Sequence, residues 1–474
     1  MKEELKNIST ETMNEFQATL TDLAPAMTVE QVMEILEISK QGQVKNTVAN
    51  AELIVSYDPL LKDGFRFNEL TQRIDVMKKM GWNRGKDGPG FTDNDLYNVH
   101  LYCNKTYGIT GLKLVEEAVH IVAYRESYHP IRDVLNSLRW DGVPRVRHAL
   151  HRYLGADESD YTYELLKFFM MGAAARVFTP GIKFDYILCL VGEQGAGKSS
   201  FFRLLAINDD WFSDDLAEMD TSKVYEKLMG HWIIEMSEML ATNNAKSNEL
   251  IKSFLSRQKE NYRIPYQRYS KDRLRQCVFA GTTNKRNFLP NDRSGNRRFL
   301  PILCIDNNAE EFILDKEKES REYIRQMWAE IMAEYRKGPV KLKLSKELES
   351  EIRSRQKQFM QEDVNAGLIL AFMQDYTGSK VCSKQLFKEA LGNAYDQPQR
   401  WQTNEINDIM NQLIREGSLP GWQYFSSPKR FGKEYGTQKG WERIPEVNKD
   451  KPTEIKFEQL SLDVKTPFDE QNSC

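Results

Sequence analysis

The chain has 474 residues, which is long enough for roughly two to four domains with separate cores. Its composition is that of an ordinary globular protein, and its formal net charge is only −3. This balance excludes a protein that coats nucleic acid with its whole surface, so any such contact must come from a local basic patch. The six cysteines include no C-x-x-C pair, which argues against a disulfide framework or a zinc site. Because the N-terminus lacks an apolar signal core and no long apolar run occurs, we expect a cytoplasmic protein without a membrane partner.

Residues 1–128 predict a mainly helical N-terminal domain. Apolar residues recur roughly at helical spacing within residues 1–40. Two further segments, Asp93–Tyr107 and Leu112–Glu126, are long enough for helices of their own. The domain is expected to end at His129-Pro130, because the residue before a proline is disfavoured in a helix.

From residue 129 to 345, apolar runs of strand length alternate with helical segments. Such alternation is typical of an α/β fold with a largely parallel sheet. The expected strands are Tyr186–Val191, Trp232–Ile234, Val278–Ala280 and Phe299–Ile305. We therefore expect one α/β domain over this part of the chain.

Residues 346–444 predict a connector and a small domain. The charged segment Lys343–Phe359 is the expected connector helix. Three short helices, followed by an aromatic and basic segment that suits a β-hairpin, are typical of a winged helix. The expected helices are Val364–Tyr376, Ser383–Leu391 and Thr403–Arg415. The last helix or the hairpin would contact DNA; a helical lid on the α/β domain is the alternative. The polar tail, residues 445–474, is expected to be disordered.

Residues 192–199 carry the phosphate-binding pattern G-x-x-x-x-G-K-[ST] between a predicted strand and a helix-compatible stretch, which is the context that this motif requires. Glycines let successive N–H groups turn inward, and the helix N-terminus adds partial positive charge. Lys198 is expected to reach the β- and γ-phosphates of ATP, and the Ser199 hydroxyl to ligate Mg²⁺. The expected nucleotide-binding residues are Gly192, Glu193, Gln194, Gly195, Ala196, Gly197, Lys198, Ser199 and Ser200. ATP is preferred to GTP in this interpretation because no base-reading motif is found.

Two carboxylates end the next apolar strand downstream. A P-loop enzyme needs an acidic residue for the magnesium shell and a group that orients the attacking water. We assign Glu235 to the Mg²⁺ shell and Glu238 to the water, with an exchange of roles left open. Asn284 follows the strand Val278–Ala280, where it would act as a sensor of the γ-phosphate or water, or simply cap the next helix.

Three arginines, Arg293, Arg297 and Arg298, precede the last expected strand. In a ring of subunits, one such arginine can reach the neighbour's γ-phosphate and stabilise charge in the transition state. An ordinary basic turn is the alternative interpretation.

A basic segment lies between the carboxylates and the sensor. Residues 252–275 hold eight basic side chains against two acidic ones, a local charge of +6. The basic residues are Lys252, Arg257, Lys259, Arg263, Arg268, Lys271, Arg273 and Arg275. Tyrosines are interleaved with them, and cations together with stacking rings are typical of a track for single-stranded DNA. Arg263, Tyr266, Arg268 and Lys271 are the expected DNA contacts; a solvated basic face is the alternative.

Taken together, these motifs resemble the virulence-associated protein E family of phage and pathogenicity-island P-loop ATPases. The motifs are HPIRDVLNSLRWDGVPRV (129–146), GEQGAGKSS (192–200), GHWIIEMSEM (230–239), YRIPYQRY (262–269), FAGTTNK (279–285) and SGNRRFLPI (294–302). The family is similar to superfamily 3 helicases and to poxvirus-type primase-helicases, with an AAA+ core. The resemblance implies a hexameric ring with 3′-to-5′ helicase character, in a bacterial host cytoplasm.

By position in these motifs, the resemblance gives Lys198 and Ser199 the nucleotide and magnesium roles. It gives Glu235 and Glu238 the acidic roles and Asn284 the sensor role. Arg298 is the best match for the arginine finger, with Arg297 next. The chain departs from the family pattern in having E-x-x-E instead of adjacent acids, and its first 130 residues show no primase motif, so a priming partner is expected on another chain.

The sequence therefore predicts an ATP-dependent helicase or translocase that acts on single-stranded or origin DNA of a phage or mobile element. The alternative from another class is a nucleotide-driven regulatory or defence switch that never unwinds DNA. A small-molecule kinase is disfavoured, because it needs neither the basic tyrosine-rich insert nor the arginines before Phe299.

Overall fold

The computed structural model describes residues 27–86, 88–216, 224–236, 245–262, 271–289, 296–360 and 363–444. The chain divides into two compact units, Met1–Gln361 and Glu362–Cys474, which are described separately. Among the described residues, every helix is too short or too polar to cross a membrane.

A five-stranded sheet with the order β4-β5-β8-β3-β9 forms the centre of the first unit. Every neighbouring pair in it is parallel, which confirms the parallel sheet predicted from the apolar runs. Its strands are β3 (Ile187–Val191), β4 (Phe212–Ser213), β5 (Ile233–Glu235), β8 (Val278–Thr283) and β9 (Phe299–Leu303). Because all strands run the same way, the segments that follow them meet at one edge of the sheet.

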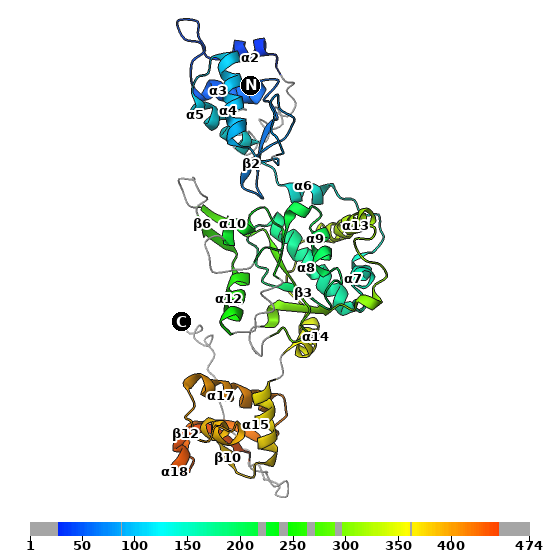
Figure 1. The fold of residues 1–474 in the computed structure, drawn as a ribbon, viewed down its shortest axis with the longest axis vertical. Helices are drawn as coiled ribbons and strands as arrows, with labels where there is room; N and C mark the ends of the chain where they lie inside the picture. The colour runs from blue at the N-terminus through cyan, green and yellow to red at the C-terminus, as the bar shows by residue number, and fades with distance from the viewer. Residues whose placement is uncertain are drawn as a thin grey trace, which may run out of the picture. The chain divides into compact units, whose positions relative to one another are not determined.

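Strand β3 is buried on both faces, and its side chains alternate between two apolar clusters. Leu188 and Leu190 join the larger cluster, with helices α8, α9 and α13. Ile187, Cys189 and Val191 join the second cluster, with α12 on the opposite face. Figure 1 shows α8, α9 and α13 gathered on one side of the sheet and α12 on the other. These helices are α8 (Asp160–Phe178), α9 (Lys198–Leu205), α12 (Ala245–Ser256) and α13 (Glu317–Tyr335).

The remaining elements around the sheet are short. Helices α6 and α7 precede the first strand of the sheet, α10 and the turns η2 and η3 lie between its strands, and η4 follows the last one. Strands β6 and β7 form a separate antiparallel hairpin. Their bounds are α6 (Pro130–Ser137), α7 (Val146–Leu154), η2 (Asp209–Trp211), α10 (Val224–Leu228), β6 (Lys259–Tyr262), β7 (Lys271–Leu274), η3 (Asn296–Arg298) and η4 (Asp306–Asn308).

The described residues between 27 and 128 contribute their own apolar cluster, built from helices α2 to α5 and a β-hairpin. The elements are α2 (Val29–Ile35), α3 (Val48–Tyr57), β1 (Phe65–Asn68), β2 (Arg73–Val76), α4 (Asp93–Tyr107) and α5 (Leu112–Arg125). The hairpin is an addition to the helical prediction. Phe65 and Phe67 are both buried, as the two-residue period of a strand requires.

The segment expected as a connector helix packs on the sheet. It forms α14 (Lys346–Gln356) and the turn η5 (Lys357–Phe359). The Gln356 side-chain amide donates to the carbonyls of Asn296 and Phe299, both at 2.7 Å. These bonds fasten the segment to the start of β9, inside the first unit.

The second unit contains three helical segments followed by a β-hairpin. A third strand, β10, completes an antiparallel sheet of order β10-β12-β11. The elements are α15 (Val364–Asp375), β10 (Lys380–Val381), α16 (Ser383–Gln385), the π-helical turn η6 (Leu386–Ala390), α17 (Arg400–Arg415), β11 (Trp422–Arg430), α18 (Gly432–Tyr435) and β12 (Thr437–Arg443). Buried residues of α15, α17 and the strands form its core, with Trp441 fully buried.

Candidate active site

The P-loop joins the carboxyl end of β3 to the N-terminus of α9. Gly195 and Gly197 have φ angles of +90° and +78°, a region that residues with a Cβ rarely adopt. The Lys198 amine donates to the carbonyl of Gly192 at 3.0 Å and to that of Glu193, so its side chain folds back over the loop. Burial lowers the pKa of Lys198, as expected for an amine removed from water.

Glu235 lies at the end of β5 and is 1% exposed. Its Oε1 accepts a hydrogen bond from the Ser199 hydroxyl at 2.8 Å and another from the Thr282 hydroxyl. Its Oε2 is buried and has no hydrogen-bond partner among the described residues. Burial raises the pKa of Glu235, although the two hydroxyl bonds oppose part of that rise. A buried carboxylate oxygen beside a serine hydroxyl suits Mg²⁺, which prefers oxygen ligands.

A single cavity of about 580 Å³ is lined by seven of the nine predicted nucleotide-binding residues, all except Gly192 and Glu193. Its lining residues are Gln194, Gly195, Ala196, Gly197, Lys198, Ser199, Ser200, Thr282, Thr283, Asn284 and Phe312. The exposed side chain of Asn284, the predicted sensor, thus belongs to the same cavity as the P-loop. Lys198, Ser199, Glu235 and Asn284 therefore converge on one site.

The strand order explains how the sensor reaches the cavity. Strand β8 lies between β3, which carries the P-loop, and β5, which carries Glu235. Its carboxyl end therefore points between the phosphate-binding loop and the carboxylate. Thr282 and Phe312 also line this cavity, and neither was predicted from the sequence as a site residue. Two threonines at a strand end were visible in the sequence, but the contact from Thr282 to Glu235 depends on the strand order.

Arg297 and Arg298 lie at the amino ends of the strands, opposite the ends that carry the P-loop and Glu235. The residue after them, Phe299, pairs with Ile187, the first residue of β3, whereas the P-loop follows the last. The amino and carboxyl ends of β3 are about five residues apart, which is roughly 16 Å along the strand. Arg298 bonds Asp185 at 3.1 Å and Ser256 at 3.0 Å, whereas Arg297 is exposed. Neither arginine lines the cavity of its own chain.

Other predicted site residues fall where the structure gives no side-chain description. Glu238, Arg263, Tyr266, Arg268 and Arg293 lie outside the described residues, and Lys271 is described only as the first residue of β7. Their predicted roles stay predictions.

Several basic residues near the hairpin are used inside the fold. Arg275 pairs with Glu260, and both side chains are buried, at 1% and 7% exposure. Lys259 pairs with Asp272 across the hairpin at 2.5 Å. These ion pairs fix the base of the hairpin. The local charge of +6 therefore overstates the charge that is left for a ligand.

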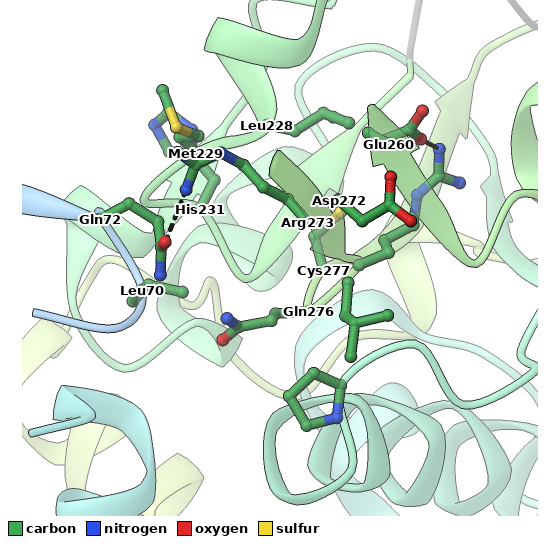
Figure 2. A pocket seen from close by; sticks show the side chains of 13 residues that line it. Leu70, Gln72, Leu228, Met229, His231, Glu260, Asp272, Arg273, Gln276 and Cys277 are labelled. Atoms are coloured by element: carbon green, nitrogen blue, oxygen red, sulfur yellow. Dashed lines mark hydrogen bonds and ion pairs between the residues drawn. The ribbon is translucent and has the colours of Figure 1, made fainter. Parts of the chain in front are cut away.

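The base of the hairpin also meets the turn between β1 and β2. Figure 2 shows Leu70 and Gln72 of that turn across a cavity from Arg273 and Gln276. Arg273 donates to the Gln72 side chain at 2.5 Å, and Gln276 donates to the carbonyl of Glu69 at 3.2 Å. The turn between β1 and β2 is therefore hydrogen-bonded to the base of the β6–β7 hairpin.

The comparisons with known proteins concern the part of the chain that holds this site. Residues 135–361 match the model of the virulence-associated protein E-like domain. No curated protein is similar enough to be a match.

The solved structures that are similar to the chain include two of the NrS-1 C-terminal region. The A-form apo structure of the NrS-1 C-terminal region is 12% identical, covers 81% of this chain and 97% of that one, and has a TM-score of 0.43. The A-form apo structure of the same region, residues 305–718, is 13% identical, covers 76% and 84%, and has a TM-score of 0.40.

The family model includes the P-loop, Glu235, Asn284 and the hairpin, which are the features that carried the resemblance. That resemblance is confirmed over the matched stretch: residues 135–361 of this chain match the virulence-associated protein E-like domain.

Proposed function

We propose that this chain is a Mg²⁺-dependent P-loop ATPase with an AAA+ core, which moves on DNA as a helicase or translocase in phage or mobile-element replication. The observation that carries the proposal is that Lys198, Ser199 and Asn284 line one cavity, while Glu235 accepts a hydrogen bond from Ser199 beside it. They come from three separate segments of the chain, yet together they offer a cation, a metal ligand, a carboxylate and an amide to a single triphosphate.

In the proposed reaction, water attacks the γ-phosphorus while the bond from that phosphorus to the β,γ-bridging oxygen breaks. Lys198 turns from the loop carbonyls to the β- and γ-phosphates. Ser199 and Glu235 would hold a Mg²⁺ ion, which would supply positive charge to the phosphate oxygens. Asn284 orients the water, and Glu238 accepts its proton, leaving ADP and phosphate.

The arginine turn serves a neighbouring subunit in this proposal. Because Arg297 and Arg298 lie about 16 Å from their own P-loop, they can reach a γ-phosphate only across a subunit boundary. Arg298 already bonds Asp185 and Ser256, so the exposed Arg297 is the better finger. That ranking reverses the one from sequence, and it supports a ring of identical subunits, a hexamer as the resemblance implies.

The proposed DNA contacts are the segment between β6 and β7 and the second unit. In the chain, Arg263, Tyr266 and Arg268 come between β6 and β7, after the strand of Glu235 and before the strand that precedes Asn284. The second unit has the element order of a winged-helix-like domain. In α17, the side chains of Asn407 and Asn411 are occupied by bonds to Ser383 and Trp441.

The hairpin of the second unit is the better candidate for phosphate contact. Its basic residues Arg430, Lys433 and Lys439 are exposed on or next to the strands. Exposed cations suit a phosphate backbone, whereas base reading by a helix needs free polar side chains. We therefore favour the hairpin over the helix.

Nucleotide chemistry is tested with three variants of the full chain. Lys198→Ala is expected to lose ATP binding, because the phosphate charge loses its nearest cation. Glu235→Gln is expected to keep ATP binding and lower hydrolysis about 10²–10³-fold, because the amide does not balance the metal charge. Glu319→Gln, an exposed position on α13, is the control and should match the parent. Equal hydrolysis in Glu235→Gln and the control would overturn the proposed site.

DNA action is tested with Arg263→Ala/Arg268→Ala. We expect weaker binding to a single-stranded oligonucleotide and a salt slope shallower by about 1.4, since each lost phosphate contact removes about 0.7. Lys316→Ala/Lys318→Ala, at the N-cap and in the first turn of α13, removes the same charge and serves as the control. Unchanged binding in the hairpin variant would refute the translocation part. Strand displacement on a forked duplex separates a motor from a regulatory or defence switch, which would hydrolyse ATP without unwinding.

A further inference from the structure

We infer that Phe312 is the platform on which the nucleobase of the bound nucleoside triphosphate stacks. This inference rests on the proposed function and identifies the part of the site that recognises the base. Phe312 follows β9 and is the one aromatic side chain among the described residues that line the P-loop cavity. The residue is 38% exposed, although most large apolar residues of the sheet are buried.

The ring lies directly against the phosphate-binding loop. A Cβ built on Gly197 would lie 3.1 Å from Phe312 Cε2, which places the ring edge beside the last glycine of the loop. The rest of the described lining consists of loop backbone and polar or small side chains. A flat apolar surface next to a phosphate cradle suits a nucleobase, because every base has a π-face that stacks on an aromatic ring.

The order of the strands in the sheet determines the orientation in which the nucleotide binds. Strands β8 and β5, on one side of β3, supply Asn284 and Glu235, which act on the γ-phosphate and metal. The segment that carries Phe312 follows strand β9, which lies on the other side of β3. A triphosphate bound across the P-loop therefore has its γ-phosphate toward β8 and its base toward β9.

The segment that carries Phe312 is held in place from α7. Arg152 pairs with Glu311 at 2.7 Å, and His148 contacts Glu310 at 3.0 Å. The next residue, Ile313, is fully buried in the main core. A ring held between such anchors loses little freedom on binding, so stacking costs little entropy.

The test compares ligands with and without a base. Isothermal titration calorimetry with Mg²⁺ measures the affinity of the full chain for ATP, CTP and inorganic tripolyphosphate. We expect Phe312→Ala to weaken ATP about tenfold, within the usual range for one stacked base, and to leave tripolyphosphate unchanged. Phe312→Trp should restore ATP binding. Ile305→Ala, an exposed apolar residue of the same connection, is the control.

Stacking also predicts a preference by ring size. The parent should bind ATP more tightly than CTP, since a purine covers more of the ring, and the preference should shrink in Phe312→Ala. An unchanged ATP affinity in that variant, or an equal loss for ATP and tripolyphosphate, would overturn the inference. Failure of the proposed function has a different signature: the parent would bind neither ligand, and Lys198→Ala would change nothing.

Discussion

Gly155 offers the sharpest test of how α7 positions the P-loop cavity. It ends α7 with a φ of +60°. A residue with a Cβ adopts this left-handed conformation at a cost of roughly 1–2 kcal/mol in the free energy of folding. A Cβ there would lie 2.0 Å from the Ile305 carbonyl oxygen and 2.7 Å from the Ala309 nitrogen. Both are backbone atoms, so the whole segment must shift, at a further cost of about 1–3 kcal/mol. Gly155→Ala should therefore destabilise the first unit by about 2–5 kcal/mol.

A second glycine separates the backbone cost from the steric one. Gly142 has a φ of +87°, and a Cβ built on it would meet nothing within 4 Å. Gly142→Ala should therefore cost only about 1–2 kcal/mol. For a domain of this size, 1 kcal/mol lowers the Tm by roughly 3 °C, so we expect losses of about 6–15 °C for Gly155→Ala and 3–6 °C for the control.

The assay is thermal unfolding, followed through the transition that ATP shifts upward. ATP affinity should fall in Gly155→Ala alone, because the displaced segment leads to Phe312. Equal Tm losses in the two variants would refute the reasoning, since the backbone contact at Gly155 would then have no effect. If Gly155→Ala lowered the Tm strongly but left the ATP affinity unchanged, the segment at Ile305–Ala309 would move without displacing the Phe312 ring.

Two further predictions concern ion pairs of the first unit. Burial lowers the pKa of His148, but its two glutamate partners outweigh this and raise it above 6.5. The resulting stability is complete below pH 6.5 and is lost as the pH rises through the folded-state pKa. The Tm difference between the parent and His148→Gln should therefore shrink from pH 6 to pH 8; a constant difference would contradict it. Glu260→Gln leaves Arg275 buried without its counter-charge, at a cost of about 3–5 kcal/mol, whereas Asp272→Asn, in an exposed pair of the same hairpin, should cost less than about 1 kcal/mol. Equal denaturation midpoints for these two variants would refute this.

The sheet and the P-loop were predictable because their signals are local. An apolar run of strand length, a glycine-rich loop and a helix stand next to each other in the sequence, and the structure has β3 and α9 on either side of that loop. The expected helices Asp93–Tyr107 and Val364–Tyr376 also match α4 and α15 closely. The strands β1 and β2 were missed because each has four residues, which is too short for a clear two-residue period.

What the sequence did not show depends on which strands are neighbours. Thr282 bonds Glu235 only because β8 lies beside β5, and no spacing in the chain encodes that order. The count of basic residues near the hairpin had a similar weakness. It treated Arg275 as a charge for a ligand, whereas the fold buries that side chain against Glu260. Burial and pairing decide whether a charge is available, and both are properties of the folded chain.

The same strand order limits what one chain can do alone. The P-loop, Glu235 and Asn284 meet at the carboxyl ends of the strands, whereas Arg297 lies at the amino ends. A long side chain does not span the roughly 16 Å between these two ends. If transition-state charge is stabilised by this arginine, it must come from another copy. Hydrolysis per chain should then rise with protein concentration in the parent and stay low in Arg297→Ala, and a concentration-independent rate would remove the arginine from the mechanism.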